Sequence, residues 1–436
     1  MKKNFISVAV CVLLFFAWLP TCDSSALAEG GNAADLRFNE DATFTVLLLS
    51  DLQETQFTTD LVLRAEQSVL DDYSADLIVL LGDQLEGSSP VLRIGDGEKN
   101  CEDTIRALLE PVSASGIPFA VVFGNHDFEA PLSVAKQAKL YESYETCIGV
   151  CYGSGAPECG AFALPVYASD GTEKTLVLFF FDSGSYITNG DYDTVSAEQV
   201  DWYSEQSAAL RLENGGQTLP AAAFFHIPLP EAYELFIEVE KGTDGAFSGV
   251  GVGKGKYYLP DYDLLFTGVV NEAPCTSSEN NGLFDAFIEN GDVFLAVNGH
   301  DHINSYIGYL DGIDLANAPG SSYTSYGDEN VRGVRLFRFT EYDLKNYETI
   351  HVRYSDYITP ASYGYLRYYF TTTTGIPNSA KVLLLFVLLV AAAIVTPVVL
   401  IIKKRKRKRN AASMDDSDAS PSADTPPAVK NEHKNE

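Results

Sequence analysis

The sequence predicts an α/β layered domain that is followed by one C-terminal transmembrane helix. Three observations carry this prediction. Short apolar runs alternate with stretches of helical periodicity, polar residues follow directly on those runs, and a long apolar run near the C-terminus precedes a cluster of basic residues. The chain has 436 residues, of which 46% are hydrophobic and 21% are charged, so it can bury a sizeable core.

The N-terminus has the pattern of a secretory signal peptide. A positively charged start precedes a largely apolar stretch over residues 5–19, and Ala26-Leu27-Ala28 forms a small-x-small cleavage site. The apolar stretch is shorter than the roughly 20 residues that span a bilayer, which favours cleavage after Ala28 over an uncut anchor. We therefore expect a signal peptide over residues 1–28 and an N-terminal linker over residues 29–42.

The middle of the chain alternates between predicted strands and predicted helices. Apolar runs predict buried strands over Phe44–Leu49, Leu77–Leu81, Phe119–Phe123, Leu176–Phe181, Ala221–Phe225 and Val293–Val297. Helical spacing predicts helices over Asp60–Tyr73, Cys101–Ser113 and Ala197–Leu212. This strand–helix–strand order is typical of an α/β domain.

The end of the domain is expected to hold antiparallel strands. Val334–Thr340 and Thr349–Tyr354 have that pattern and predict a second, mixed sheet that closes the domain. The domain is therefore predicted over residues 43–356. Residues 357–381 are first rich in tyrosine and then in threonine, and are expected to form a membrane-proximal stalk.

Residues 382–402 form an apolar run of 21 residues without a charge, which is long enough to cross about 30 Å of hydrocarbon. Seven consecutive basic residues, 403–409, follow it, and the positive-inside rule places such a cluster in the cytoplasm. A buried core helix is the less favoured alternative, because a soluble helix has no need of these cations. The sequence thus predicts a single-pass type I protein of the cell membrane, with an extracellular domain and a disordered cytoplasmic tail ending at residue 436.

The charge of the chain limits the classes of partner. Acidic residues number 60 and basic residues 30, for a net charge of −30. A nucleic-acid-binding protein presents a basic face, so we expect no nucleic-acid partner. The membrane, through the C-terminal helix, remains as an expected partner.

Five cysteines lie in the predicted domain, namely Cys101, Cys147, Cys151, Cys159 and Cys275. An exported domain is able to form disulfides from them, although the sequence does not choose among the pairings. The spacing of the middle three favours a disulfide-tied loop over a zinc site, because no Cys-x-x-Cys motif or nearby histidine accompanies them.

Polar motifs follow five of the apolar runs at the point where each predicted strand ends. They read Ser50-Asp51-Leu52-Gln53, Leu81-Gly82-Asp83-Gln84, Gly124-Asn125-His126-Asp127, Phe225-His226-Ile227-Pro228 and Gly299-His300-Asp301-His302. Open α/β sheets place ligands at the carboxyl ends of their strands, so these side chains are expected to meet there. Carboxylate, amide and imidazole groups without thiolate suit divalent ions such as Mn, Fe or Zn.

This ordered series resembles the signature of the calcineurin-like metallophosphoesterases. Short segments around the third and fourth motifs, including Gly116-Ile117-Pro118 and His226-Ile227-Pro228, are similar to the purple-acid-phosphatase-like branch. The resemblance covers about residues 43–355. It implies a layered sandwich of two mixed β-sheets flanked by helices, and hydrolysis of phosphate esters by a dinuclear metal centre.

The resemblance also implies roles for single residues. The first metal would be held by Asp51, Gln53, Asp83 and His302. The second would be held by Asp83, Asn125, His226 and His300. His126 would contact the phosphate and protonate the leaving oxygen, and Asp127 would orient its ring.

Two departures from the family pattern leave alternatives open. Gln53 stands where most members have histidine, and an amide oxygen is a poorer ligand for zinc-like ions. Glu86 stands where purple acid phosphatases have a tyrosine, so no ferric charge-transfer colour is expected. Gln53 motivates a phosphodiesterase or nucleotide pyrophosphatase as one alternative. A surface binding protein on a decayed phosphatase domain is the other.

Overall fold

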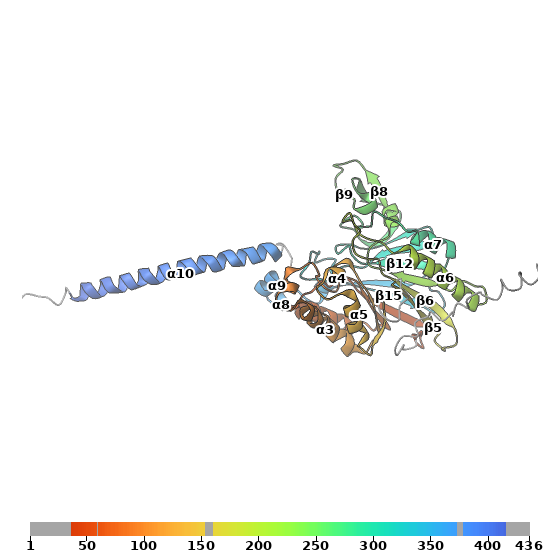
Figure 1. Ribbon diagram of the computed structural model, residues 1–436, viewed down its shortest axis with the longest axis horizontal. Coiled ribbons are helices and arrows are strands. Elements are labelled where there is room, and N and C mark those ends of the chain that lie inside the picture. Colours follow the sequence, from red (N-terminus) through yellow and green to blue (C-terminus); the bar gives the residue numbers. More distant parts are fainter. Residues whose placement is uncertain (1–35, 59, 153–159, 373–377, 416–436) are drawn as a thin grey trace, which may run out of the picture. The chain divides into compact units, whose positions relative to one another are not determined.

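The computed structural model describes residues 36–58, 60–152, 160–372 and 378–415 (Figure 1). Contacts divide the chain into two units, residues 1–375 and residues 376–436, each of which is described by itself. The first unit contains both β-sheets and all of the predicted site residues. The predicted signal peptide, residues 1–28, lies outside the described residues.

The first sheet has six strands in the order β16-β15-β1-β2-β3-β4. The strands are β1 (Thr43–Leu49), β2 (Leu77–Leu81), β3 (Phe119–Val122), β4 (Cys147–Val150), β15 (Gly333–Thr340) and β16 (Glu348–Arg353). The first four are parallel to one another, whereas β15 pairs antiparallel with β1 and β16 antiparallel with β15. The sheet is therefore mixed, with its parallel part in the middle and at one edge.

The second sheet has seven strands in the order β11-β13-β14-β12-β7-β6-β5. They are β5 (Ala161–Tyr167), β6 (Lys174–Phe181), β7 (Ala221–Phe224), β11 (Leu265–Val269), β12 (Val293–Asn298), β13 (Ser305–Leu310) and β14 (Ile313–Asn317). Strands β6, β7, β12 and β14 are parallel, and antiparallel strands complete both edges. A separate small sheet, in the order β8-β10-β9, consists of β8 (Phe236–Val239), β9 (Phe247–Ser248) and β10 (Tyr257–Pro260).

Helices cover the outer face of each large sheet, so the unit has four layers. Figure 1 shows α3 (Gly97–Ser115) and α5 (Val134–Glu142) on one side, and α6 (Ala197–Glu213) and α7 (Leu283–Asn290) on the other. The remaining helices of this unit are α2 (Asp60–Asp72), α4 (Asn125–Glu129), α8 (Pro360–Tyr363), α9 (Tyr365–Thr371) and the 3₁₀ turns η1 (Pro90–Arg93), η2 (Pro230–Leu235), η3 (Gly251–Gly253) and η4 (Tyr354–Asp356).

Alternation along the strands builds two kinds of core. In β1, Val46 and Leu48 face the second sheet, while Leu47 and Leu49 pack in the cluster beneath the helices. Strands that are buried on both faces read as continuous apolar runs, which is why the sequence revealed them. The core between the sheets includes a stack of aromatic rings: the Phe180 ring lies 4.5 Å from Phe162 and 5.2 Å from Phe224.

The structure confirms an α/β fold with mixed sheets but assigns the last two strands differently. β15 and β16 were expected to form a second sheet, whereas they extend the first one, because β15 pairs with β1 from Thr43↔Thr340 onward. The second sheet is built instead from strands in the middle of the chain. Several of these, including β11 and β13, carry exposed or polar positions that hide them from a search for apolar runs.

The structure corrects the predicted fold class at its C-terminal end. Residues 382–402 lie within α10 (Asn378–Asp415), a helix of 38 residues that continues without a break through the basic residues 403–409. Within the described parts of the chain, no helix is both long enough and apolar enough to cross a membrane. The sequence prediction considered the apolar run by itself, and the expected type I topology depended on it.

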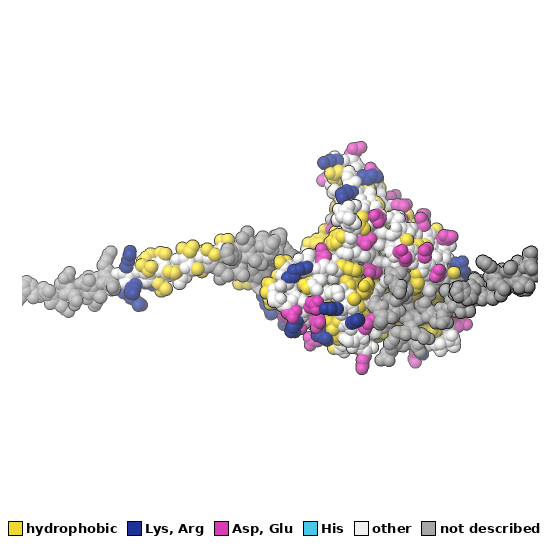
Figure 2. All heavy atoms as spheres, viewed as in Figure 1, with side chains coloured by type: hydrophobic (Ala, Val, Ile, Leu, Met, Phe, Trp, Pro, Cys, Tyr) yellow, Lys and Arg dark blue, Asp and Glu magenta, His cyan; other side chains and the backbone are white. Residues whose placement is uncertain are grey.

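Residues 357–372, expected to begin a stalk, contact helix α2 in the structure. The Tyr357 hydroxyl lies 2.9 Å from an Asp72 carboxylate oxygen, and Arg367 lies 2.7 Å from Asp60. Tyr368 is buried in the core beneath the helices. Figure 2 shows acidic side chains spread over the visible face of the described domain, in keeping with the net charge of −30.

Cys101, Cys147 and Cys275 carry free thiols. Cys159 falls in residues 153–159, outside the described residues, so the expected disulfide-tied loop stays a prediction.

We expect Phe180→Ala to lower the free energy of unfolding by about 3–5 kcal/mol, because it leaves a cavity in the fully buried stack between the sheets. Leu212→Ala on helix α6 is the control, since that side chain is 81% exposed. Urea unfolding followed by circular dichroism measures both. A loss below about 1 kcal/mol for Phe180→Ala would contradict the packing described here.

Candidate metal centre

The predicted site residues come together where the carboxyl edges of the two sheets meet. Asp51 and Gln53 follow β1, Asp83 follows β2, Asn125 and His126 follow β3, His226 follows β7, and His300 and His302 follow β12. The first three strands belong to one sheet and the last two to the other. Because all five strands are members of parallel arrays, their carboxyl ends point toward the same edge.

One group of side chains forms around Asp83. Ligand atoms of Asp83, His226 and His300 all lie within 4.8 Å of one another, and all three residues are buried. The closest of these contacts joins His226 Nε2 to Asp83 Oδ2 at 3.3 Å. A carboxylate and two imidazoles at this separation are a suitable ligand set for a divalent ion.

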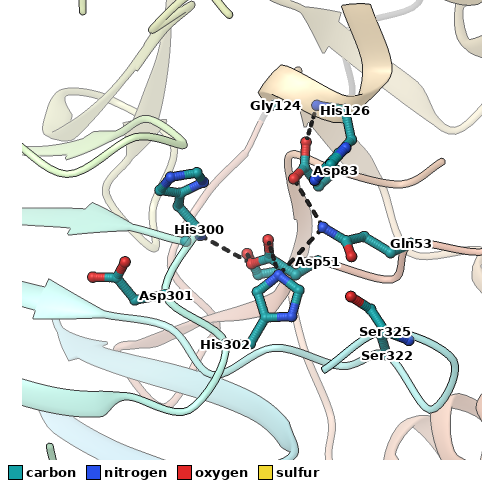
Figure 3. Close-up of polar contacts among 12 residues, drawn as sticks. Asp51, Gln53, Asp83, Gly124, His126, His300, Asp301, His302, Ser322 and Ser325 are labelled. Carbon is teal, nitrogen blue, oxygen red and sulfur yellow. Dashed lines mark hydrogen bonds and ion pairs between the residues drawn. The ribbon is translucent and has the colours of Figure 1, made fainter. Parts of the chain in front are cut away.

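A second group forms around Asp51. His302 Nε2 lies 3.2 Å from Asp51 Oδ1, and Gln53 Nε2 lies 3.2 Å from His302 Nε2. Gln53 Nε2 also donates to Asp83 Oδ2 at 3.1 Å, which joins the two groups. Figure 3 shows Asp51, Gln53, Asp83 and His302 turned toward one another. The two ends of an amide have nearly the same shape, so a half-turn of Gln53 would present an oxygen at the same place.

Backbone carbonyls fix the orientation of two histidines. His226 Nδ1 lies 2.8 Å from the carbonyl oxygen of Leu81, and His302 Nδ1 lies 3.0 Å from that of Tyr326. A carbonyl oxygen only accepts, so each Nδ1 carries a proton and each Nε2 is the ring nitrogen that faces the carboxylates. Histidines that bind metals are commonly held in this way by a partner on the other ring nitrogen.

Four buried polar atoms of the predicted ligands make no hydrogen bond, although Asp51 Oδ1 and His226 Nε2 each lie within 3.3 Å of another predicted ligand atom. They are Asp51 Oδ1, Asn125 Oδ1, His226 Nε2 and His300 Nε2. Buried polar atoms are almost always paired, and each unpaired one costs about 1–3 kcal/mol. Other unpaired buried atoms occur among the described residues, but these four all lie just after the strands that carry the predicted motifs. The residues present therefore fit a divalent metal centre, which would satisfy these atoms together.

The backbone is strained at the same positions. Asp51, Gln53, Asp83 and His300 adopt φ angles of 54°, 42°, 55° and 71°. Residues other than glycine rarely adopt this left-handed region, and each such residue costs on the order of 1–3 kcal/mol. Strain of this kind persists where the surrounding structure imposes it, and it turns the side chains at the strand ends into the shared centre.

Gly124 makes the close approach of these groups possible. A Cβ atom at this position would lie 2.2 Å from Asp83 Oδ1 and 2.6 Å from His226 Nε2. The motif Gly-Asn-His-Asp thus needs its glycine for space, because the backbone of residue 124 passes directly beside the ligand atoms.

The buried charges shift the pKa values of the histidines in opposite directions. Burial by itself lowers the pKa of His226, but the carboxylates of Asp83 and Asp51 outweigh it and raise the pKa to about 10. Burial and the neighbouring His226 lower the pKa of His300 to about 3. The two buried carboxylates are therefore stabilised by positive charge close to them. A divalent ion bound between the ligands would supply that charge.

Glu129, and not Asp127, contacts the ring of His126. Glu129 Oε2 lies 2.6 Å from His126 Nδ1. Both residues lie on helix α4, where residues three apart share a face and consecutive residues do not. The prediction that Asp127 orients His126 is thus wrong, and a reading of residues 125–129 as a helix would have pointed to Glu129.

Asp127 instead supports the loop that carries Asp83. Its Oδ2 accepts hydrogen bonds from the backbone N–H groups of Asp83 at 2.8 Å and Gly124 at 3.0 Å, and its Oδ1 accepts one from Leu85 at 3.1 Å. Burial and the charge of Asp83 raise the pKa of Asp127 to about 7, whereas the N–H donors lower it. Asp127 is therefore a positioning residue for the β2 and β3 loops.

Three tyrosines border the centre and were not predicted from the sequence. The Tyr326 ring stacks on His302 at 4.1 Å, and its hydroxyl lies 3.3 Å from Glu272 Oε1. The Tyr192 ring meets the His300 ring edge to face at 4.4 Å. Tyr186 accepts a hydrogen bond from Asn125 Nδ2 at 2.9 Å. They reach the site through loops distant in the sequence, and no spacing rule predicts such contacts.

A family model for calcineurin-like phosphoesterases matches residues 44–304, which is more than half of the chain. The chain belongs to the calcineurin-like phosphoesterase family. The matched span begins in β1 and ends just after the His300-Asp301-His302 motif, so it contains every predicted ligand. Calcineurin-like phosphoesterases use a dinuclear divalent metal centre, which agrees with the donor atoms described above.

Two plant proteins are similar to this calcineurin-like phosphoesterase. "Probable inactive purple acid phosphatase 14" of Arabidopsis thaliana is 28% identical over 380 residues, covering 79% of this chain and 86% of the relative. "Probable inactive purple acid phosphatase 28" of the same plant is 26% identical over 332 residues, covering 68% and 74%. These likenesses agree with the purple-acid-phosphatase-like branch indicated by the sequence motifs.

One solved structure is similar in fold. The crystal structure of a dimetal phosphatase from Danio rerio superposes with a TM-score of 0.43 and 13% sequence identity. The superposition covers 67% of this chain and 92% of the other.

We expect Asp83→Asn to lower the metal content of the protein, because it removes a buried charge that both groups of ligands share. Asp311→Asn is the matched control: Asp311 also has a left-handed φ, of 48°, but is exposed in the turn between β13 and β14. Elemental analysis after dialysis gives the metal-to-protein ratio. An unchanged ratio in Asp83→Asn would contradict the assignment of Asp83.

Proposed function

We propose that this protein is a metal-dependent phosphoesterase that hydrolyses small phosphate esters. The observation that carries the proposal is the cluster of buried ligand atoms on Asp83, His226 and His300, all within 4.8 Å of one another, together with unpaired buried atoms on Asp51, Asn125, His226 and His300. Family membership supports the same reaction class. The acidic body would repel polyanionic polymers, which favours small substrates.

The ligands would form the two sets that the sequence resemblance implies. Asp51, Gln53, Asp83 and His302 would hold one divalent ion, and Asp83, Asn125, His226 and His300 the other. Ions in such a centre supply Lewis acidity to a phosphoryl oxygen and activate water as a nucleophile. Mn, Fe and Zn all suit these oxygen and imidazole donors.

His126 has the position of a general acid. Its side chain is 24% exposed, unlike the buried ligands around it, and its backbone N–H donates to Asp83 Oδ1 at 2.7 Å. Glu129 holds Nδ1, so Nε2 is free to give a proton to the leaving oxygen. Burial lowers the pKa of His126, but the carboxylates of Asp83, Glu86 and Glu129 outweigh it and raise the pKa, which favours the protonated ring.

A phosphate-binding protein without turnover is the second candidate. Gln53 favours it, because its amide nitrogen points into the centre and donates to Asp83. The names of the two Arabidopsis relatives describe them as probably inactive.

One experiment separates the two candidates. The metal-free chain is reloaded with Mn, Fe, Zn, Co or Mg and assayed with a phosphomonoester and a phosphodiester, while phosphate binding is measured by calorimetry. Metal-dependent turnover supports the phosphoesterase, and the preferred ester distinguishes a phosphomonoesterase from a phosphodiesterase. Phosphate binding without turnover by any metal-loaded form supports the binding protein.

We expect His126→Ala to keep its metal and to lower kcat by about 10²- to 10⁴-fold, because it removes the proton donor without removing a ligand. Elemental analysis and steady-state kinetics measure the two effects. His351→Ala is the control, since that histidine lies on β16, away from the centre. An unchanged kcat would remove His126 from the mechanism.

We expect Gln53→His to tighten metal binding beside Asp51, because an imidazole is a better ligand than an amide for zinc-like ions. Titration with a competing chelator measures the affinity. If the affinity of both sites stays at the wild-type value, residue 53 is not a ligand.

A further inference from the structure

Ser50 is a buried residue that lies between the end of strand β1 and the predicted ligand Asp51. Its hydroxyl donates a hydrogen bond to Asp51 Oδ2 at 2.6 Å. A hydrogen bond from a hydroxyl to a carboxylate is short and is stronger than one between two neutral groups. The hydroxyl of Ser50 therefore restricts how the Asp51 carboxylate is turned.

The two oxygens of the Asp51 carboxylate have different surroundings. Oδ2 accepts from the Ser50 hydroxyl and also from the backbone N–H of His300 at 3.0 Å, a contact that Figure 3 marks with a dashed line. Oδ1 is buried, makes no hydrogen bond, and lies 3.2 Å from His302 Nε2. One oxygen is thus occupied by two donors of the chain, whereas the other is available to a metal ion.

Contacts from both large sheets hold Ser50 in place. Its backbone carbonyl accepts from the N–H of Ser321 at 2.9 Å, and the Ser321 hydroxyl donates to the carbonyl of Gly333 at 2.8 Å. On the other side, a Cβ atom on Gly299 would lie 2.1 Å from Ser50 Oγ. Gly299 comes directly before His300, so the Ser50 hydroxyl fits between the loops that follow β1 and β12.

We propose that Ser50 is a positioning residue that holds Asp51 Oδ2 and thereby leaves Oδ1 as the oxygen that binds a divalent ion. This inference rests on the metal centre of the proposed function and concerns the ion beside Asp51. Because two donors occupy Oδ2, Asp51 would bind this ion through one oxygen only. Residues that orient a metal ligand in this way typically change metal affinity by about 10- to 100-fold.

The proposed role differs from a role in stability alone. The Ser50 hydroxyl has one hydrogen to donate, and Asp51 receives it. Asp51 belongs to one of the two proposed ligand sets, so removal of the hydroxyl should weaken the binding of one ion and spare the other. A hydroxyl that served stability alone would lower the free energy of unfolding without this difference between the two ions.

The test measures the affinity of each ion in the full chain. Ser50→Ala is stripped of metal and titrated with Mn or Zn in the presence of a competing chelator. We expect one of the two ions to bind about 10- to 100-fold more weakly and the other to keep its wild-type affinity. Unchanged affinities, or an equal loss for both ions, would overturn the inference.

Ser321→Ala is the matched control. Ser321 is also fully buried and its hydroxyl also donates a hydrogen bond, but the acceptor is the carbonyl of Gly333 and not a predicted ligand. The backbone N–H that contacts Ser50 is kept in this variant. We expect Ser321→Ala to unfold at a lower urea concentration and to keep both metal affinities. If it weakened one ion as much as Ser50→Ala does, the effect would follow from stability alone and the inference would be wrong.

A crystal structure of the metal-loaded wild type tests the inference without any variant. The ion beside Asp51 should contact Oδ1 alone, while Oδ2 keeps its hydrogen bonds with the Ser50 hydroxyl and the His300 N–H. An ion bound through Oδ2, or through both oxygens, would overturn the inference and leave the proposed function intact. If the wild type bound no divalent ion, the proposed function would fail with it.

Discussion

The carboxylate of Asp83 is the group on which the centre depends. One oxygen accepts from the backbone of His126, and the other lies within 3.3 Å of both His226 Nε2 and Gln53 Nε2. Its backbone N–H is in turn held by Asp127. Loops from β1, β2, β3 and β7 are therefore connected through one side chain. A buried charge of this kind is tolerated only where partners surround it, so each loop has to deliver its partner accurately.

The two packed sheets hold these loops in position. Two sheets with continuous apolar cores fix where their strands end, and the left-handed residues turn the side chains from those ends into the shared space. The strain at these residues and the unpaired atoms they bring would each be unfavourable alone. The two features coincide at Asp51 and His300 and otherwise occur on neighbouring predicted ligands, which is the pattern of a site organised for a ligand and not of a fold organised for stability alone.

The sequence predicted the site residues that come directly after a strand along the chain. Candidate ligands such as His226 and His300 were predictable because each comes just after a continuous apolar strand. The contact between Glu129 and His126 was missed because Asp127, the next residue in the sequence, was taken as the partner of His126. On helix α4, residues three apart share a face, so Glu129 contacts His126 instead. Tyr186 and Tyr326 reach the centre only through tertiary folding. The apolar run at 382–402 was overinterpreted, because the sequence did not show that its helix continues through the basic residues.

Different residues would serve the binding of metal and phosphate and the protonation of the leaving group. The departure at Gln53 affects the Asp51 side of the centre, while the cluster of Asp83, His226 and His300 contains only strong donors. His126 takes its orientation from Glu129, which lies on the same helix, α4. A weakened first site would therefore leave His126, the proposed proton donor, in place. Loss of one ligand at Gln53 thus argues for altered metal preference before it argues for a dead enzyme, because the groups that act on the leaving oxygen do not depend on that position.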